Sequence, residues 1–171
     1  MQCINLLVDC DLVMPGLKVL IVGSGGREHA LAIGLSNSPS VESIHTCPGN
    51  AGTAMLGVNH AVPASDVNAV VELAIELSVD LVVVGPEAPL VSGISDSLRE
   101  KGIPSFGPHS EGAELEGSKL HAKQMMEQLR IPTAGVQILK PDSDIDAALS
   151  RYSPPWVIKR DVLAAGKGVV V

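Results

Sequence analysis

The stretch KVLIVGSGGREHAL, residues 18–31, places a short apolar run, a glycine loop and a helical segment directly after one another. The apolar run Lys18–Val22 ends at a glycine, and such a run predicts a buried strand. The glycines within 23–26 predict a tight turn, and the apolar positions within 27–35 predict a helix. A strand that passes through a turn into a helix is the first unit of a parallel sheet.

The same alternation continues along the chain. Strands are predicted at 41–47, 58–62, 80–84 and 103–106, and helices at about 66–77 and 92–101. Ser65 or Asp66 would cap the first of these helices. Aromatic residues make up only 2% of the chain, so the core must be aliphatic, as in a parallel sheet buried on both faces. We therefore predict an α/β fold with three layers, in which helices cover both faces of a Rossmann-like parallel sheet.

The sequence changes character after Gly107-Pro108, where we place a domain boundary. Beyond it, the pattern predicts helices over 110–130 with Ser118 as a cap, a strand at 133–139, a helix at 142–151 and a strand at 156–160. The predicted units are a sheet domain over 18–108 and the beginning of a second domain over 109–171.

Residues 1–17 are treated separately, because they are apolar but match no targeting signal. They contain Asp9 and Asp11, and no basic residue precedes Lys18, which disfavours a secretory signal and a membrane-spanning helix. We interpret this segment as a non-core extension, with a small added strand as the alternative.

Charge and cysteine content narrow the class of protein. A net charge of −7 disfavours a nucleic-acid surface, which needs a basic face, and we expect neither nucleic acid nor membrane as a partner. The three cysteines include no CxxC pair, which favours reduced thiols and a cytoplasmic location. The five histidines show no metal-ligand spacing, and no catalytic triad can be assembled, so the sequence predicts no metal site and assigns no catalytic residue.

Three loops are expected at one edge of the sheet, because each follows a predicted strand. Gly23, Gly25, Gly26 and Arg27 could bind an anion through free backbone N–H groups and a guanidinium. The other two loops are 48–52 and 85–90. Each loop also has a plainer interpretation: a turn that binds no ligand for the first two, and a capping or solvated Glu87 for the third.

The last predicted strand ends at Lys159, and a loop of small residues with Lys167 and a second β-branched strand follow it. Two strands joined by a glycine-lysine loop form a hairpin that could close over a polyphosphate. Lys159 ends an apolar strand, where a charge needs a partner such as a phosphate unless the side chain extends to the solvent.

A dinucleotide-binding oxidoreductase domain is one alternative, but its glycine pattern is incomplete. Glu28 stands where the third glycine of that pattern is expected, and the second predicted strand ends without an acidic residue for a ribose. A non-catalytic remnant or binding module is the other alternative.

Together these segments resemble the phosphoribosylamine–glycine ligase (glycinamide ribonucleotide synthetase) family of the ATP-grasp superfamily. The resemblance extends from Lys18 to Val171 and rests on segments 18–31, 48–54 (PGNAGTA), 80–96 (DLVVVGPEAPLVSGISD), 106–108 (FGP), 115–123 (LEGSKLHAK), 131–134 (IPTA) and 157–171 (VIKRDVLAAGKGVVV). It implies an ATP-dependent ligation of glycine to 5-phospho-β-D-ribosylamine in purine biosynthesis. ADP and phosphate would be released.

The resemblance also implies roles for individual residues. The phosphoribosylamine would be held by residues of the three loops: Gly23, Gly25, Gly26, Arg27, Asn50, Gly52, Glu87 and Pro89. ATP would be held by Lys119, Lys159 and the loop residues Ala165, Gly166, Lys167 and Gly168. The ligands of Mg²⁺ or Mn²⁺ are expected beyond Val171, so we expect the chain to be the N-terminal part of a longer enzyme and inactive alone.

One position departs from the family. The family usually reads Lys-Ala-Asp-Gly-Leu where this chain reads Lys159-Arg160-Asp161-Val162-Leu163. A positive φ at Val162 would be strained.

Overall fold

The computed structural model describes residues 16–163 and 169–171. The strands are β1 (Leu17–Gly23), β2 (Val41–Pro48), β3 (Val58–Asn59), β4 (Leu81–Val84), β5 (Ser105–Phe106), β6 (Ile158–Lys159) and β7 (Val169–Val170). The helices are α1 (Gly26–Ser36), the 3-10 turn η1 (Thr53–Met55), α2 (Val67–Glu76), α3 (Glu87–Val91), α4 (Ile94–Glu100), α5 (Ser110–Gly117), α6 (Lys119–Gln128) and α7 (Ile145–Leu149). Among the described residues, no helix combines the length and apolarity needed to cross a membrane.

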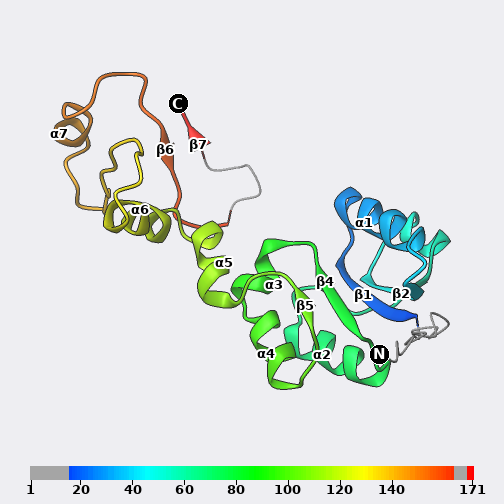
Figure 1. Ribbon diagram of the computed structural model, residues 1–171. Helices are drawn as coiled ribbons and strands as arrows, with labels where there is room; N and C mark the ends of the chain where they lie inside the picture. The colour runs from blue at the N-terminus through cyan, green and yellow to red at the C-terminus, as the bar shows by residue number, and fades with distance from the viewer. Residues whose placement is uncertain (1–15, 164–168) are drawn as a thin grey trace, which may run out of the picture.

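The first five strands form one parallel sheet in the order β3-β2-β1-β4-β5 (Figure 1). β1 lies at the centre and pairs with β2 on one side and β4 on the other. The chain therefore adds β2 and β3 on one side of β1 and then crosses over to add β4 and β5 on the other side. The sheet confirms the predicted Rossmann-like architecture and creates a change of direction between β1 and β4, where such sheets bind ligands.

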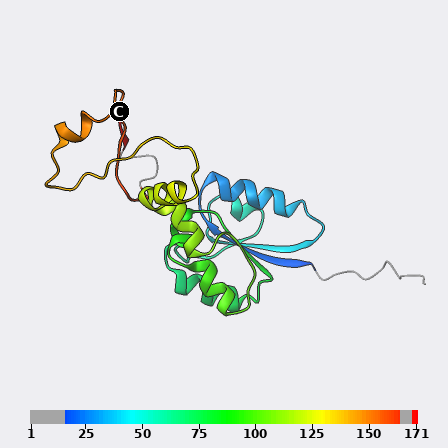
Figure 2. The ribbon, with the colours of Figure 1, turned by 60° about the vertical axis from the view of Figure 1, so that its left-hand side comes forward.

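Helices cover both faces of this sheet, which gives the predicted three layers (Figure 2). Val19 and Ile21 belong to a buried cluster with Ala32 of α1, whereas Leu20 and Val22 belong to a cluster with residues of α2, α3 and α4. Successive side chains of a strand point to opposite faces, so an uninterrupted apolar run is required when both faces are buried.

Three elements of the sheet domain differ from the prediction, one of which is the strand expected at 103–106, limited to Ser105 and Phe106. The helix expected at 92–101 starts at Ile94, and the short helix α3 precedes it at Glu87–Val91. Gly93 separates the two helices with a φ of 84°, a left-handed conformation that glycine adopts readily. The strand expected at 58–62 is limited to Val58 and Asn59, because only these residues pair with β2.

The structure decides which of the two predicted residues, Ser65 or Asp66, caps α2. The Asp66 carboxylate accepts a hydrogen bond of 3.1 Å from the backbone N–H of Ala69. This contact satisfies one of the free N–H groups of the first helical turn.

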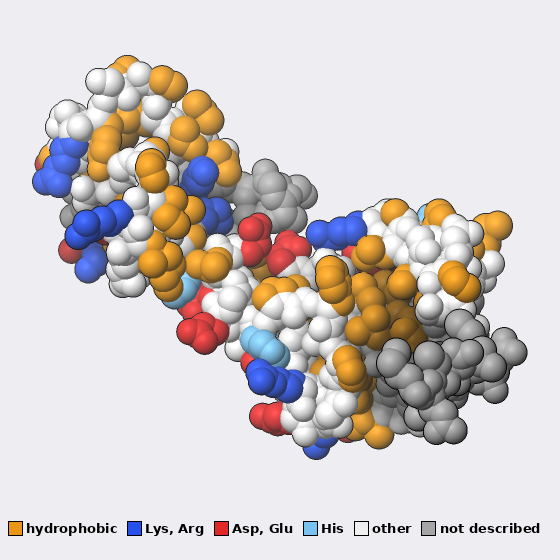
Figure 3. Space-filling view, viewed as in Figure 1, with side chains coloured by type: hydrophobic (Ala, Val, Ile, Leu, Met, Phe, Trp, Pro, Cys, Tyr) orange, Lys and Arg blue, Asp and Glu red, His pale blue; other side chains and the backbone are white. Residues whose placement is uncertain are grey.

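Helix α5 packs against α3 and α4, and its Ala113 is buried in the core formed by the five-stranded sheet and its covering helices, which together are called the sheet body. Ser118 then caps α6 as predicted, since its hydroxyl accepts a 3.0 Å hydrogen bond from His121. The hairpin is also confirmed, because β6 and β7 pair antiparallel. The strand expected at 133–139 is not formed, and α7 occupies only part of 142–151. Residues 131–140 are exposed, and many apolar side chains after α5 lie at the surface (Figure 3).

Cys47 at the end of β2 is a buried free thiol, and burial raises its pKa to about 12 from an ordinary value of 9.0. The thiolate is the reactive form, so Cys47 should resist iodoacetamide at pH 8 in the folded protein and react once urea unfolds it. The raised pKa also means that its contribution to stability is intact below about pH 9 and declines as the pH rises towards 12. Peptide-resolved mass spectrometry distinguishes Cys47 from Cys3 and Cys10. Modification at the same rate in native and unfolded protein would contradict this expectation.

Candidate functional site

The three loops predicted to share an edge do lie together at the carboxyl ends of the central strands. The backbone N–H of Gly49, after β2, donates to the carbonyl of Gly23 at 3.1 Å, and that of Gly85, after β4, donates to Val22 at 3.0 Å. The loops that follow β2 and β4 therefore both attach to the end of β1. This arrangement brings segments more than 60 residues apart in sequence to one edge of the sheet.

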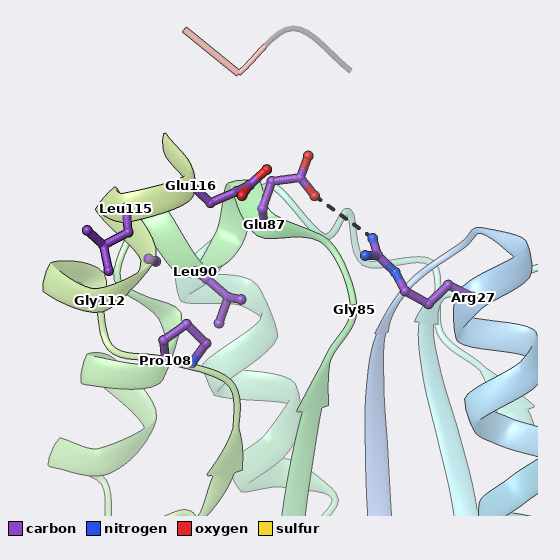
Figure 4. Close-up of a pocket in the computed structure, with 9 residues that line it drawn as sticks. Arg27, Gly85, Glu87, Leu90, Pro108, Gly112, Leu115 and Glu116 are labelled. Atoms are coloured by element: carbon purple, nitrogen blue, oxygen red, sulfur yellow. Dashed lines mark ion pairs between the residues drawn. The ribbon is translucent and has the colours of Figure 1, made fainter. Parts of the chain in front are cut away.

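A cavity of about 370 Å³ opens where the strand order changes direction, beside the ends of β1 and β4. It is lined by Arg27, Gly85, Glu87, Leu90, Pro108, Gly112, Ala113, Leu115 and Glu116 (Figure 4). The Nη2 atom of Arg27 lies 3.9 Å from Oε2 of Glu87 across this gap. The two side chains are 64% and 40% exposed, so the ion pair is weak and both groups remain accessible to a ligand.

Glu28 is a buried residue beside the cavity whose place in the site sequence reasoning missed. In the sequence it stands out only as a departure from the dinucleotide pattern, whereas in the structure its side chain is 5% exposed. Oε2 accepts a 2.6 Å hydrogen bond from the Gly25 N–H, and Oε1 accepts one of 3.2 Å from Nε of Arg27. The Gly25 N–H is therefore already engaged within the protein. The N-cap residue of α1 is Gly25, which has no side chain that could accept a hydrogen bond from the first helical turn. The Glu28 carboxylate is therefore the side chain that caps the start of α1.

Three glycines make room for that carboxylate. A Cβ at Gly23 would lie 2.7 Å from Cδ of Glu28, one at Gly25 would lie 2.9 Å from Oε2, and one at Gly85 would overlap Oε1. The sequence contains a signal for this packing, because β1 ends at Gly23 and Gly85 directly follows β4. Two strand ends with glycine opposite one acidic residue indicate a close approach of backbone and side chain.

Asn50 joins the loop after β2 to the loop after β1. Its Nδ2 donates to the carbonyls of Ser24 and Gly25 at 3.0 and 3.1 Å. Its Oδ1 accepts from the backbone N–H groups of Gly52 and Thr53 at 2.8 and 3.1 Å. All these bonds are internal, so the side chain positions the loops. The buried Thr53 hydroxyl extends the network to Asn59 at 2.9 Å, and sequence reasoning missed both of these residues.

The other predicted residues of this site differ in position. Gly26 begins α1 and has open space around it, whereas a side chain at Gly52 would overlap the ring of His29. Pro89 is buried within α3 and does not line the cavity. Gly26 is therefore accessible from the solvent, and Gly52 and Pro89 are packing positions.

The segments expected to hold ATP also meet. Nζ of Lys119 donates a 2.8 Å hydrogen bond to the carbonyl of Val162, across 43 positions of sequence. The Asp161 carboxylate accepts from the Leu120 N–H at 3.1 Å and from the Ser118 hydroxyl at 3.2 Å. The Leu120 N–H is the main reason that the pKa of Asp161 lies below its ordinary value, with Ser118 and Lys119 adding to it.

Two further features of this segment bear on the sequence predictions. Among the described residues, the only non-glycine residues with a positive φ are Ser78 and Arg130, so Val162 is not strained by its backbone. Lys159 lies in β6 and is exposed. Ala165, Gly166, Lys167 and Gly168 lie outside the described residues.

No group of three or more potential metal ligands occurs within residues 16–163 and 169–171. Two histidines do approach each other: Nδ1 of His45 lies 3.0 Å from Nε2 of His60. Burial, followed by the neighbouring His60 and Lys18 charges, lowers the pKa of His45. The pair joins β2 to the segment after β3 and lies apart from the cavity lining.

Comparison with known proteins gives consistent matches. The family model for the N domain of phosphoribosylglycinamide synthetase matches residues 17–116, and the model for its ATP-grasp (A) domain matches residues 117–171. The chain is 52% identical over 155 residues to the phosphoribosylamine–glycine ligase of Streptomyces coelicolor, and 48% identical over 160 residues to that of Mycobacterium tuberculosis. These matches cover 91% of this chain, which spans only 37% and 38% of the two relatives.

Solved structures agree with the sequence matches. The phosphoribosylamine–glycine ligase of Thermotoga maritima superimposes with a TM-score of 0.68 at 35% identity, over 90% of this chain and 35% of that one. The biotin carboxylase domain of the Hydrogenobacter thermophilus 2-oxoglutarate carboxylase superimposes with a TM-score of 0.69 at 19% identity, over 92% and 37% of the two chains. The second likeness shows a shared fold.

Proposed function

Because the chain belongs to the phosphoribosylglycinamide synthetase family, we propose that it contributes to the ATP-dependent ligation of glycine to 5-phospho-β-D-ribosylamine. The observation that carries this proposal is the cavity at the change of strand direction, where Arg27 and Glu87 face each other from the first turns of α1 and α3. In this role, residues 18–108 form the phosphoribosylamine-binding domain, with α5 packed against it. An ATP-grasp domain begins within residues 109–171.

The charges at the cavity suit a ligand that carries both an anion and an amine. Arg27 can donate two parallel hydrogen bonds to a phosphate, which is the geometry that guanidinium groups favour. Glu87 and Glu116 line the same cavity and can accept hydrogen bonds from an amine or a sugar hydroxyl. The exposed Gly26 has open space around it, so a ligand can approach the backbone there, beside the loop held by Asn50.

The ATP-binding part of the proposal rests on the residues around α6 and the β6-β7 hairpin. Lys119 and Lys159 supply positive charge towards the phosphates. The contribution proposed for Ala165, Gly166, Lys167 and Gly168 falls outside the described residues. Lys119 would exchange its contact with the Val162 carbonyl for a phosphate oxygen. A magnesium or manganese ion, when bound, would supply further charge to the phosphates. The described residues do not form a cluster that fits such an ion.

The remaining parts of the proposal concern the surroundings of the reaction. The partners are small molecules, namely phosphoribosylamine, glycine and ATP, and the location is the cytoplasm. The chain carries net negative charge, so the local Arg27 and the lysines, rather than the overall field, must attract these anionic substrates.

Titration calorimetry with ribose 5-phosphate, a pentose phosphate without the amine, tests the proposed sugar-phosphate site. We expect saturable binding by the whole chain, no binding of ribose at the same concentration, and at least roughly tenfold weaker binding by Arg27→Ala, because a charge-assisted contact is lost. Arg151→Ala removes an equal charge from a residue that does not line the cavity, and should bind as the wild type does.

Equal binding of ribose and ribose 5-phosphate would contradict the proposed site. NADH serves as a further titrant in the same experiment. Saturable NADH binding together with no response to ribose 5-phosphate would favour the dinucleotide-binding alternative.

A further inference from the structure

The buried carboxylate of Glu28 is not used by the proposed ligation, although it lies directly beneath the loop that would bind the sugar phosphate. A negative charge at this place should oppose the binding of a phosphate. Its side chain is nevertheless enclosed, and three glycines leave the space that it occupies. A close-packed arrangement of this kind around a charged group calls for a specific role, because burying a charge is expensive.

The contacts of Glu28 divide between backbone and side chain. Oε2 holds the Gly25 N–H at 2.6 Å, and Oε1 holds Nε of Arg27 at 3.2 Å. Of the five N–H donors of a guanidinium, the one on Nε is thereby turned inward. The terminal nitrogens are left to face the cavity, and Nη2 lies 3.9 Å from Glu87.

We propose that Glu28 is a positioning residue: its carboxylate holds Nε of Arg27, so that the terminal guanidinium nitrogens face the cavity as a preformed phosphate-binding fork. This inference rests on the proposed function and specifies how its phosphate end is recognised. Without the Glu28 contact, the exposed Arg27 side chain would adopt many rotamers and would lose more conformational entropy on binding a ligand.

The substitution Glu28→Gln separates positioning from capping. Glutamine has the same shape, and its amide oxygen can still accept from the Gly25 N–H. Its amide nitrogen would then face Nε of Arg27, so that two donors meet and the guanidinium is released. Simple charge considerations and positioning predict opposite results: removal of a nearby negative charge would strengthen phosphate binding, whereas loss of positioning would weaken it.

Calorimetric titration of the whole chain with ribose 5-phosphate distinguishes these outcomes. We expect Glu28→Gln to weaken binding roughly tenfold, and the double variant Arg27→Ala/Glu28→Gln to bind no more weakly than Arg27→Ala alone, because coupled residues are non-additive. The matched control is Glu76→Gln, which makes the same change of charge at an exposed position on α2. This variant should bind ribose 5-phosphate as the wild type does.

Equal or tighter binding by Glu28→Gln, or additive losses in the double variant, would overturn the role of Glu28 while leaving the proposed function intact. Failure of the wild type to bind ribose 5-phosphate would overturn both. A measurement on the wild type avoids the possibility that a variant misfolds. In the NMR spectrum of the ligand-free protein, the Nε–H proton of Arg27 should exchange slowly with water, because it is held by Glu28. Fast exchange of this proton would overturn the inference.

Discussion

Substitution of Gly85 by alanine is expected to weaken ribose 5-phosphate binding by roughly tenfold or more and to destabilise the fold by about 1–3 kcal/mol. The new Cβ would overlap the Oε1 atom of Glu28 and lie 2.6 Å from its Cδ. Gly85 is fixed by its hydrogen bond to Val22 at the end of β1, so the backbone cannot easily retreat. The Glu28 side chain must move, and it then releases the Gly25 N–H and Arg27.

Gly34→Ala is the matched control for this substitution. It adds the same methyl group within α1, where the new Cβ would have no atom within 4 Å apart from the adjoining backbone of the helix itself. Replacing glycine by alanine inside a helix should stabilise the protein by roughly 0.5–1 kcal/mol. Thermal unfolding followed by far-ultraviolet circular dichroism and the ribose 5-phosphate titration give the two readouts. Wild-type stability and binding in Gly85→Ala would show that the Glu28 pocket tolerates the added methyl group.

Substitution of Asn50 by alanine is expected to destabilise the sheet body by about 2–3 kcal/mol. The amide side chain makes hydrogen bonds to Ser24, Gly25, Gly52 and Thr53, each worth about 1 kcal/mol net, and water can replace part of this at the exposed carbonyls. The loss also frees the loop after β2 from the loop after β1. Ribose 5-phosphate binding should weaken for this reason, although Asn50 directs its bonds inward.

Urea unfolding measures this effect, and Asn37→Ala provides the control. Asn37 caps the end of α1 and makes one exposed side-chain hydrogen bond, to Ile33 at 2.9 Å, so its removal should change the free energy of unfolding by less than about 0.5 kcal/mol. Circular dichroism is the appropriate probe, since the single tryptophan, Trp156, lies outside the five-stranded sheet. Equal unfolding free energies for the two variants would refute a structural role for Asn50.

The sheet and its covering helices were predictable because their signals are local. Residues 19–22 are apolar at every position, as a strand buried on both faces requires. The parallel direction of the strands follows from the helices between them, and it places the loops after β1, β2 and β4 at one edge. The Ser118 cap and the β6-β7 hairpin likewise depend on neighbouring residues.

Elements whose stability depends on distant partners were predicted less well. The strand expected at 133–139 is not formed among the described residues, since β-branched residues favour a strand only where another strand can pair with it. The strand at 58–62 was limited for the same reason to the residues that pair with β2. Helix α3 was missed because a five-residue helix carries too little periodicity to be recognised.

The sequence by itself determined the family, the alternation of strands and helices that builds the parallel sheet, and the loops that form the proposed site. Only the tertiary structure decided what the individual side chains do within those loops. Asn50 is saturated by internal hydrogen bonds, Glu28 is buried against glycines from two strands, and Lys119 meets the Val162 carbonyl. The contacts of Asn50 with Gly25, of Glu28 with Gly85 and of Lys119 with Val162 join residues that are distant along the chain, so their geometry exists only after the fold has brought these segments together.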